Sequence, residues 1–175
     1  MSNFQKALTL VLSHEGGYAD NPADRGGPTN MGITLKTLQQ SSPTATVEDL
    51  KALSPDGARA IYQREYWDAL RLDCVSNDCL ASVVLDLAVL RGVGATIHSL
   101  QFLLGMKSDG ILGPETRALF FHAANNDPRL LAFDLILHTQ YCLGLLVKKD
   151  PTQAAFIEGW LGRTQELLRL TLGMP

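Results

Sequence analysis

Cysteine is scarce in this sequence, and its pattern excludes a scaffold built on disulfides. Three cysteines occur among 175 residues, at Cys74, Cys79 and Cys142. Disulfide-rich domains carry a denser, even set of cysteines, whereas the 46% of hydrophobic residues in this chain are enough to bury a core. We expect three buried free thiols, because unpaired cysteine is commonly buried. A Cys74–Cys79 bridge formed after export is the alternative.

The sequence also lacks the patterns of a metal site and of a nucleic-acid-binding surface. Its four histidines are scattered, and none lies at metal-ligand spacing. The 15 Lys and Arg against 18 Asp and Glu give a formal net charge of −3. No basic cluster occurs beyond Lys148–Lys149, whereas binding to phosphates requires lysine and arginine. We therefore predict no metal, no cofactor and no nucleic-acid partner.

Long uninterrupted hydrophobic runs are missing too. The most apolar stretch, Leu130 to Val147, is interrupted by Asp134, His138 and Gln140. A membrane-spanning helix needs about 20 predominantly apolar residues. We interpret this stretch as an amphipathic or buried helix and not as a span.

The first residues do not resemble a secretory signal peptide. A short apolar run, Ala7 to Leu12, has no basic start, and His14–Glu15 follows it instead of a small-residue cleavage site. We expect a protein made in the cytoplasm. If its substrate lies outside the membrane, a separate export route must carry it there.

Helical periodicity dominates what the sequence does contain. Apolar residues recur at helical spacing through residues 3–15, and Gly16–Gly17 follows as a stop signal. A capping residue followed by proline marks further helix starts at Ser54–Pro55, Asp127–Pro128 and Asp150–Pro151. The pattern gives roughly eight or nine helices and almost no strand, so the predicted fold class is all-α.

Two features break this helical pattern. Residues 16–33 are rich in Gly, Pro, Asn and Asp, which is typical of a turn-rich loop or a small irregular hairpin. The composition changes around residue 90, which we take as a soft boundary. We expect two halves, 1–90 and 91–175, packed as one compact unit.

Glu15 is the strongest candidate for a chemical role. It lies four residues after Val11 and seven after Leu8, which places it on the apolar face of the first helix. Partial burial and the negative end of the helix dipole both favour a protonated carboxyl. A glycosidase needs such an acid to protonate the leaving oxygen. The alternative is a helix-end glutamate held in a salt bridge or open to water.

A second carboxylate follows within ten residues. Asp20 and Asp24 are both available; beside Asn21–Pro22 we interpret Asp20 as a turn former. Asp24 is a turn former, a partner for Arg25, or the base that activates water, with the Thr29 hydroxyl helping to hold that water. An inverting glycosidase separates its two carboxyls by roughly 6.5–9.5 Å, and we expect that separation between Glu15 and Asp24.

The segment HEGGY, followed by D-x-GG-x-T-x-x-GIT, resembles the signature of glycoside hydrolase family 108. Members are bacterial and phage N-acetylmuramidases with a lysozyme-like helical fold. The resemblance implies that Glu15 is the essential acid and that Glu15, Asp24 and Thr29 correspond to the triad of phage-type lysozymes. Here the gap from Asp to Thr is one residue shorter, so Thr34 is an alternative holder of the water. The resemblance also implies substrate contacts at Tyr18, Asn30 and Thr34.

The segment IYQREYWDAL also matches the family, whose members carry a Tyr–Trp pair at this place. Aromatic faces pack against the C–H surfaces of sugars, so Tyr66 and Trp67 are candidates for the cleft wall. Large aromatics at helical spacing are also typical of a core, and this alternative stays open.

Residues 86–120 are similar to the peptidoglycan-binding region that follows the catalytic part in the same family. The Leu100–Gln101 pair and the loop Asp-Gly…Gly-Pro-x-Thr carry the similarity. The residues themselves indicate a turn at Asp109–Gly110 and a helix start at Gly113–Pro114. The segment is therefore either a ligand-binding region or a turn that only separates two helices. Arg91, in the first part of the segment, reaches either the cleft or solvent.

The sequence thus predicts a lysozyme-type muramidase. We expect it to be a monomer, with peptidoglycan as its partner, that acts in the periplasm or cell wall after release through a holin or another export route. Relatives include phage endolysins and muramidases that open the wall for toxin export. Two alternatives remain: a lytic transglycosylase that uses Glu15 alone, and a non-catalytic wall-binding adaptor.

Overall fold

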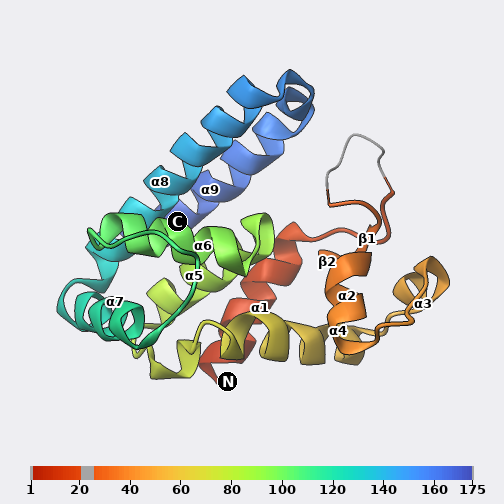
Figure 1. Ribbon diagram of the computed structural model, residues 1–175, viewed down its shortest axis with the longest axis horizontal. Helices are drawn as coiled ribbons and strands as arrows, with labels where there is room; N and C mark the ends of the chain where they lie inside the picture. The colour runs from red at the N-terminus through yellow and green to blue at the C-terminus, as the bar shows by residue number, and fades with distance from the viewer. Residues whose placement is uncertain (1, 21–25, 175) are drawn as a thin grey trace.

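The computed structural model describes residues 2–20 and 26–174, and the protein is 73% helical (Figure 1). The all-α prediction is confirmed. The α-helices of the described residues are α1 Asn3–His14, α2 Leu35–Ser41, α3 Val47–Lys51, α4 Pro55–Ile61, α5 Asp78–Arg91, α6 Val93–Leu103, α7 Pro114–Asn126, α8 Pro128–Lys149 and α9 Ile157–Leu172. The tighter or wider helical segments are η1 Tyr62–Asp68, η2 Leu72–Cys74 and η3 Pro151–Phe156.

Helix α5 is the centre of the molecule. All its residues from Leu80 to Ala88 are buried. Helices α1, α6, α8 and α9 pack around it (Figure 1). Such continuous burial, on every side of a helix, is typical of a fully enclosed core position. The predicted boundary near residue 90 falls at the end of this helix, where Gly92 with φ +88 leads into α6. Both halves of the chain therefore share one core.

Helix α1 forms as its apolar spacing predicts. Ser2 and Gln5 make a reciprocal capping box at its start, and its buried stripe faces α5. Leu12, which the periodicity also placed on the stripe, is 39% exposed. The helix ends at His14, and neither following glycine takes a left-handed conformation. The chain instead leaves through Glu15 in an extended conformation, with φ −94 and ψ 135.

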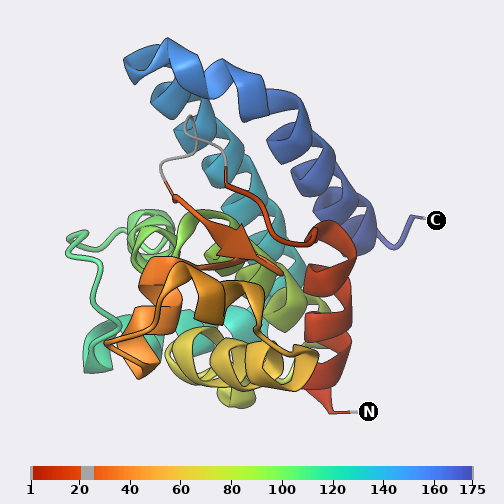
Figure 2. The ribbon, with the colours of Figure 1, turned by 90° about the vertical axis from the view of Figure 1, so that its right-hand side faces the viewer.

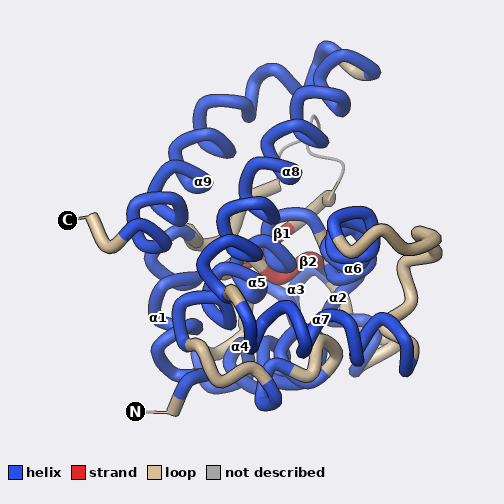
Figure 3. The backbone as a smooth tube through the Cα atoms, turned by 90° about the vertical axis from the view of Figure 1, so that its left-hand side faces the viewer, coloured by secondary structure: helices blue, strands red, loops and turns tan. Residues whose placement is uncertain are grey.

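The predicted hairpin is present as two short strands, β1 Thr29–Asn30 and β2 Ile33–Thr34. They pair antiparallel, and Ala19 pairs with Thr29 on the outer side. Figure 3 shows this pair beside α2 and α3, as the single sheet in the described part of the chain. The two turn residues, Met31 and Gly32, both have positive φ (49 and 71). That combination is typical of the tight turns that join twisted strands.

Helices α8 and α9 form a long antiparallel arm that extends beyond the rest of the molecule (Figures 1 and 2). Among the described residues, α8 is the one helix that is long and apolar enough to span a membrane, with a mean hydropathy of 1.7 over its best window. One such helix is weak evidence for a span, because core helices meet the same test. In this structure 33% of that window is buried, and α8 packs on α5 and α9.

The three cysteines are free, as predicted, but they are not all buried. Cys74 lies in η2 and is exposed, and Cys79 and Cys142 are half-buried. The expectation of three buried thiols was therefore wrong, because it rested on a general preference of cysteine and not on the packing of these segments.

The loop between α6 and α7 is organised by one buried side chain. The Gln101 amide oxygen accepts from the backbone N–H groups of Asp109 and Gly110, and its NH₂ donates to the Asp109 carboxylate, the Ile111 carbonyl and the Thr116 hydroxyl. This network explains why Gln101 and the loop Asp-Gly…Gly-Pro-x-Thr, which carry the similarity to the peptidoglycan-binding region, occur together. In this structure they hold a loop in place.

Candidate active site

Glu15 is held between α1 and the turn of the hairpin. As the C-terminal cap of α1 it leaves the helix at the point where the chain straightens. A Cβ at position 32 would stand 2.5 Å from the Glu15 carboxyl carbon and 2.6 Å from the Tyr62 hydroxyl. Only glycine fits this position, since its φ of +71 also disfavours other residues. The hairpin turn therefore presses directly against the carboxyl.

Tyr62 holds the same hairpin turn in place through a hydrogen bond. Its hydroxyl donates to the Met31 carbonyl at 2.7 Å, which supports the left-handed conformation of that residue. Burial raises the pKa of the Tyr62 phenol, so this side chain remains a neutral donor. The segment η1 thus determines the shape of the hairpin at Glu15.

Arg163 on α9 joins Glu15 to the core. Its Nη1 lies 2.6 Å from Glu15 Oε1, and its Nε lies 2.7 Å from Asp86 Oδ1. The Arg163 and Glu15 side chains are only 11% and 14% exposed, and that of Asp86 is fully buried. Burial alone would lower the pKa of Arg163, but Asp86 and Glu15 outweigh burial and raise it. The guanidinium is therefore a permanent cation between two carboxylates.

His14 extends this network to the protein surface. Its Nδ1 lies 2.9 Å from Asp86 Oδ2, and its Nε2 lies 2.6 Å from Glu166 Oε2. Hydrogen bonding to Asp86 raises the pKa of His14, against the effect of burial, and Glu166 adds to the rise. Asp86 thus has a partner at each of its oxygens, Arg163 Nε at Oδ1 and His14 Nδ1 at Oδ2, which satisfies a buried carboxylate.

The charge environment of Glu15 differs from the sequence expectation. That expectation counted the apolar stripe and the helix end, which both favour a protonated carboxyl. The structure adds a buried guanidinium, whose Nη1 lies 2.6 Å from Glu15 Oε1. The side chain is thus the salt-bridged glutamate of the alternative interpretation, but it lies in a cavity and not at an open surface.

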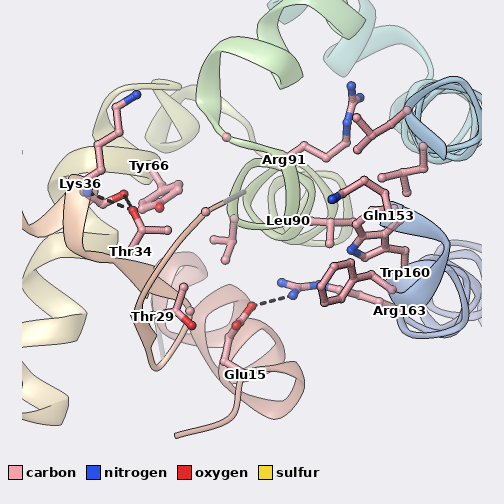
Figure 4. Close-up of a pocket in the computed structure, with 18 residues that line it drawn as sticks. Glu15, Thr29, Thr34, Lys36, Tyr66, Leu90, Arg91, Gln153, Trp160 and Arg163 are labelled. Carbon is pink, nitrogen blue, oxygen red and sulfur yellow. Dashed lines mark hydrogen bonds and ion pairs between the residues drawn. The ribbon is translucent and has the colours of Figure 1, made fainter. Parts of the chain in front are cut away.

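A cleft of about 640 Å³ opens beside this carboxyl. Figure 4 shows Thr29, Thr34, Lys36 and Tyr66 on one side and Gln153, Trp160 and Arg163 on the other, with Glu15 between them. The first wall comes from the hairpin, α2 and η1, and the second from α8, η3 and α9. The cleft therefore lies between the two halves of the chain.

Comparisons with known proteins identify both halves. Residues 8–92 match the family described as Glycosyl hydrolase 108, and residues 95–165 match the family described as Predicted Peptidoglycan domain. The structure of Brucella abortus SagA matches with a TM-score of 0.82 and 30% identity, over 98% of this chain and 94% of that chain. The chain belongs to glycosyl hydrolase family 108. No curated protein sequence gave a match.

Three of the side chains predicted for this family 108 site line the cleft with Glu15: Thr29, Thr34 and Tyr66. The Thr34 hydroxyl already caps α2, where it accepts from the Thr37 N–H at 3.0 Å, and it lies 3.0 Å from the Thr37 hydroxyl. Tyr66 is largely buried, and burial raises the pKa of its phenol. Asp24 lies outside the described residues, so its separation from Glu15 stays a prediction.

Three other predicted contacts lie away from the residues that line the cleft. Trp67 is 1% exposed, packs edge-to-face on Phe4, and donates to Asp73, which makes it a core residue. The structure corrects its placement in the cleft wall, since its indole ring is enclosed on all sides. Of the two interpretations given for this tryptophan, the core one describes it.

Asn30 and Tyr18 have local partners. The buried Asn30 amide donates to the backbone carbonyl of Leu50 at 2.9 Å and so ties the hairpin to α3. The Tyr18 ring is exposed, with Lys51 Nζ 5.1 Å from its centroid. Neither residue lines the cleft, so their predicted sugar contacts have no support in this geometry.

Sequence reasoning missed Arg163, Asp86, Phe156 and Trp160 as parts of the site. One usable signal existed for Asp86, because it is the only charged residue between Leu80 and Leu90. A carboxylate in such an apolar run is rarely buried without a cationic partner. Nothing local indicated which of the 15 Lys and Arg residues that partner is.

Proposed function

We propose that this family 108 protein hydrolyses the β-1,4 bond between N-acetylmuramic acid and N-acetylglucosamine in peptidoglycan, with Glu15 as proton donor. The position of Glu15 carries the proposal. Its side chain is 14% exposed, lies against Gly32, and lines a cleft of about 640 Å³. The two family matches support a glycosidase that acts on this polymer.

In the proposed reaction, the bond between the anomeric carbon and the bridging oxygen breaks as Glu15 gives its proton to that oxygen. Water adds its oxygen to the anomeric carbon, and Asp24 takes up the proton that this water releases, with Thr29 or Thr34 holding the water. Proton transfer by positioned carboxyls contributes about 10²–10⁴-fold to such reactions. The residues present require no metal or cofactor for these steps.

The Arg163 contact sets a requirement on this mechanism. A general acid must present its carboxyl to the bridging oxygen, whereas Glu15 Oε1 is engaged by Arg163 Nη1 at 2.6 Å. We propose that a bound glycan separates the guanidinium from Glu15 Oε1. Asp86 keeps Arg163 paired during this change, because it binds Nε and not Nη1.

The decisive experiment compares wild type with Glu15→Gln on purified sacculi. We expect turbidity to fall with wild type and to stay constant with Glu15→Gln, while circular dichroism and thermal melting show the same fold. Glu115→Gln is the matched control, since Glu115 is an exposed carboxylate on α7 outside the cleft. Lysis by Glu15→Gln at the wild-type rate would refute the assignment of the acid.

Mass spectrometry of the products separates the remaining alternatives. Hydrolysis yields reducing N-acetylmuramic acid ends. Products with 1,6-anhydro ends would instead identify a lytic transglycosylase, in which the muramyl 6-hydroxyl replaces water. A wild-type protein that binds sacculi of every tested composition but cleaves none would favour the non-catalytic adaptor.

The predicted setting of the reaction is part of the same proposal. We propose a monomer that acts in the periplasm or cell wall after release through a holin or another export route. Light scattering tests the monomer directly. Lysis of cells that express the protein with a holin, and their survival without it, tests the route.

A further inference from the structure

A pair of aromatic side chains forms part of the cleft wall opposite the hairpin. Phe156 ends η3 and Trp160 lies in the first turn of α9, and their rings stack with centroids 5.8 Å apart and an interplanar angle of 29°. Both rings line the cleft and are half-buried. Trp160 precedes Arg163 by three residues on the same helix, a spacing that places both side chains on one face.

This partial exposure sets the pair apart from the core aromatics. Trp67, the other tryptophan, is fully enclosed, whereas the Trp160 indole is on the cleft surface beside Arg163 (Figure 4). Leu143 and Leu146 on α8 line the same cleft. The wall is thus a half-buried apolar platform within a cleft that also contains the candidate acid.

Polar groups flank the platform. Gln153 and Arg163 line the cleft on the same side, and Arg91 lies at its edge (Figure 4). An apolar, aromatic surface with a few converging polar groups is typical of a small-ligand site. A pyranose ring is complementary to such a surface. Its faces carry C–H groups that can lie on an aromatic ring, and its edge carries hydroxyl and acetamide groups that can meet the polar side chains. The platform therefore fits one sugar ring stacked on an aromatic face.

We propose that Phe156 and Trp160 form a saccharide subsite, on which one ring of the glycan strand stacks while Glu15 acts on a neighbouring glycosidic bond. The inference rests on the proposed hydrolase function for the identity of the glycan. It assigns a role to the second half of the chain: residues within the segment matched as a predicted peptidoglycan domain bind substrate inside the catalytic cleft.

Binding is measured in the Glu15→Gln protein, so that cleavage does not interfere. The probe is a peptide-free tetrasaccharide of alternating N-acetylglucosamine and N-acetylmuramic acid, titrated by calorimetry. We expect Trp160→Ala to weaken its binding about tenfold and Trp160→Phe to weaken it less, in line with the usual contribution of an aromatic contact. Tyr141→Ala is the matched control, since this exposed aromatic on α8 lies outside the cleft, and it should leave the Kd unchanged.

A second measurement needs no substitution in the platform. The chain has two tryptophans, and since Trp67 is enclosed, quenching by acrylamide reports mainly on Trp160. We expect the tetrasaccharide to protect the fluorescence of the Glu15→Gln protein from acrylamide. Absence of protection, or a Kd for Trp160→Ala equal to that of its parent, would overturn the subsite.

The two proposals fail in different ways. If wild type lyses sacculi while Trp160→Ala binds the tetrasaccharide as its parent does, the subsite is wrong and the hydrolase stands. If the tetrasaccharide binds on Trp160 but wild type cleaves no glycan, the subsite stands and the hydrolase is wrong.

Discussion

Gly32 is the residue that most tightly constrains the candidate acid. It is the point at which the hairpin touches the Glu15 carboxyl, and no other residue fits there without moving one of the two. The position combines a steric limit with a backbone limit, because its φ is +71. These two effects can be separated by experiment.

We predict that Gly32→Ala lowers lytic activity by about 10²-fold, since a displacement of about 1 Å in a catalytic group costs that much. Gly27→Ala is the control: its φ is +69, but nothing lies within 4 Å of an added Cβ. Both variants should lose about 1–3 kcal/mol of stability for a non-glycine residue in this conformation, and Gly32→Ala should lose more because its Cβ also meets Glu15 and Tyr62. Equal activity losses in kinetic assays would mean that backbone strain, and not contact with Glu15, is responsible.

His14 makes the stability of the fold depend on pH. Its pKa is raised in the folded protein, chiefly by Asp86 and then by Glu166, so the folded state binds a proton more tightly than the unfolded chain. The stabilisation is fully present below the ordinary histidine pKa of 6.5 and is lost as pH rises through the raised value.

We therefore predict that the free energy of unfolding of wild type falls as the pH rises above 6.5, the ordinary histidine value, measured by urea denaturation. In His14→Gln this slope should be smaller, because the titrating group is gone. A slope unchanged by the substitution would place the titration on another group. His122→Gln serves as the control, since this exposed histidine on α7 pairs with Asn126 and not with a carboxylate.

At the scale of elements, the loop between α6 and α7 depends on Gln101. Its amide makes five hydrogen bonds to the loop and to the start of α7. Gln101→Leu keeps the approximate volume but leaves backbone donors of Asp109 and Gly110 without their acceptor. We expect a loss of about 1–3 kcal/mol and faster proteolysis within residues 105–113. Lytic activity at low temperature should remain, because this loop does not line the cleft.

Elements with local signals could be predicted from the sequence. The apolar stripe and capping residues predicted α1, and the Gly- and Asn-rich segment predicted the hairpin. The stop signal at Gly16–Gly17 placed Glu15 at the end of α1. The predicted helix ended at residue 15, whereas α1 ends at His14, because Glu15 takes an extended conformation.

Side-chain environments set by distant parts of the chain could not be predicted. Arg163 contacts Glu15 across 148 residues, and no periodicity encodes such a pairing. Tryptophan and asparagine are residue types that can bind sugars. Here Trp67 is buried because it packs against Phe4, and Asn30 is buried because it hydrogen-bonds to α3. Phe156 and Trp160 belong to a segment that the sequence assigned to a different half of the molecule.

At the scale of the whole molecule, the shared core argues against independent halves. Helix α5 is covered by α1 from one half and by α6, α8 and α9 from the other. Removing residues 93–175 would expose its buried side chains and leave Asp86 without Arg163. Loss of the partner of a buried charge costs about 3–5 kcal/mol by itself.

We predict that a protein containing only residues 1–92 does not fold and has no lytic activity. Circular dichroism and the dispersion of NMR amide signals measure this directly. A matched pair of separately expressed fragments, 1–92 and 93–175, should recover helicity and activity only when mixed. A folded and active 1–92 fragment would show that the second half is dispensable for both the core and the cleft.

The separation of Glu15 and Arg163 by 148 residues also has a consequence for biosynthesis. The ribosome releases Glu15 well before α9, so a nascent chain carries the candidate acid long before the helix that completes its surroundings. Products of interrupted translation that stop before residue 157 lack the wall of the cleft that α9 supplies and the guanidinium that pairs with Asp86. The cleft is therefore complete only after the ribosome has released α9.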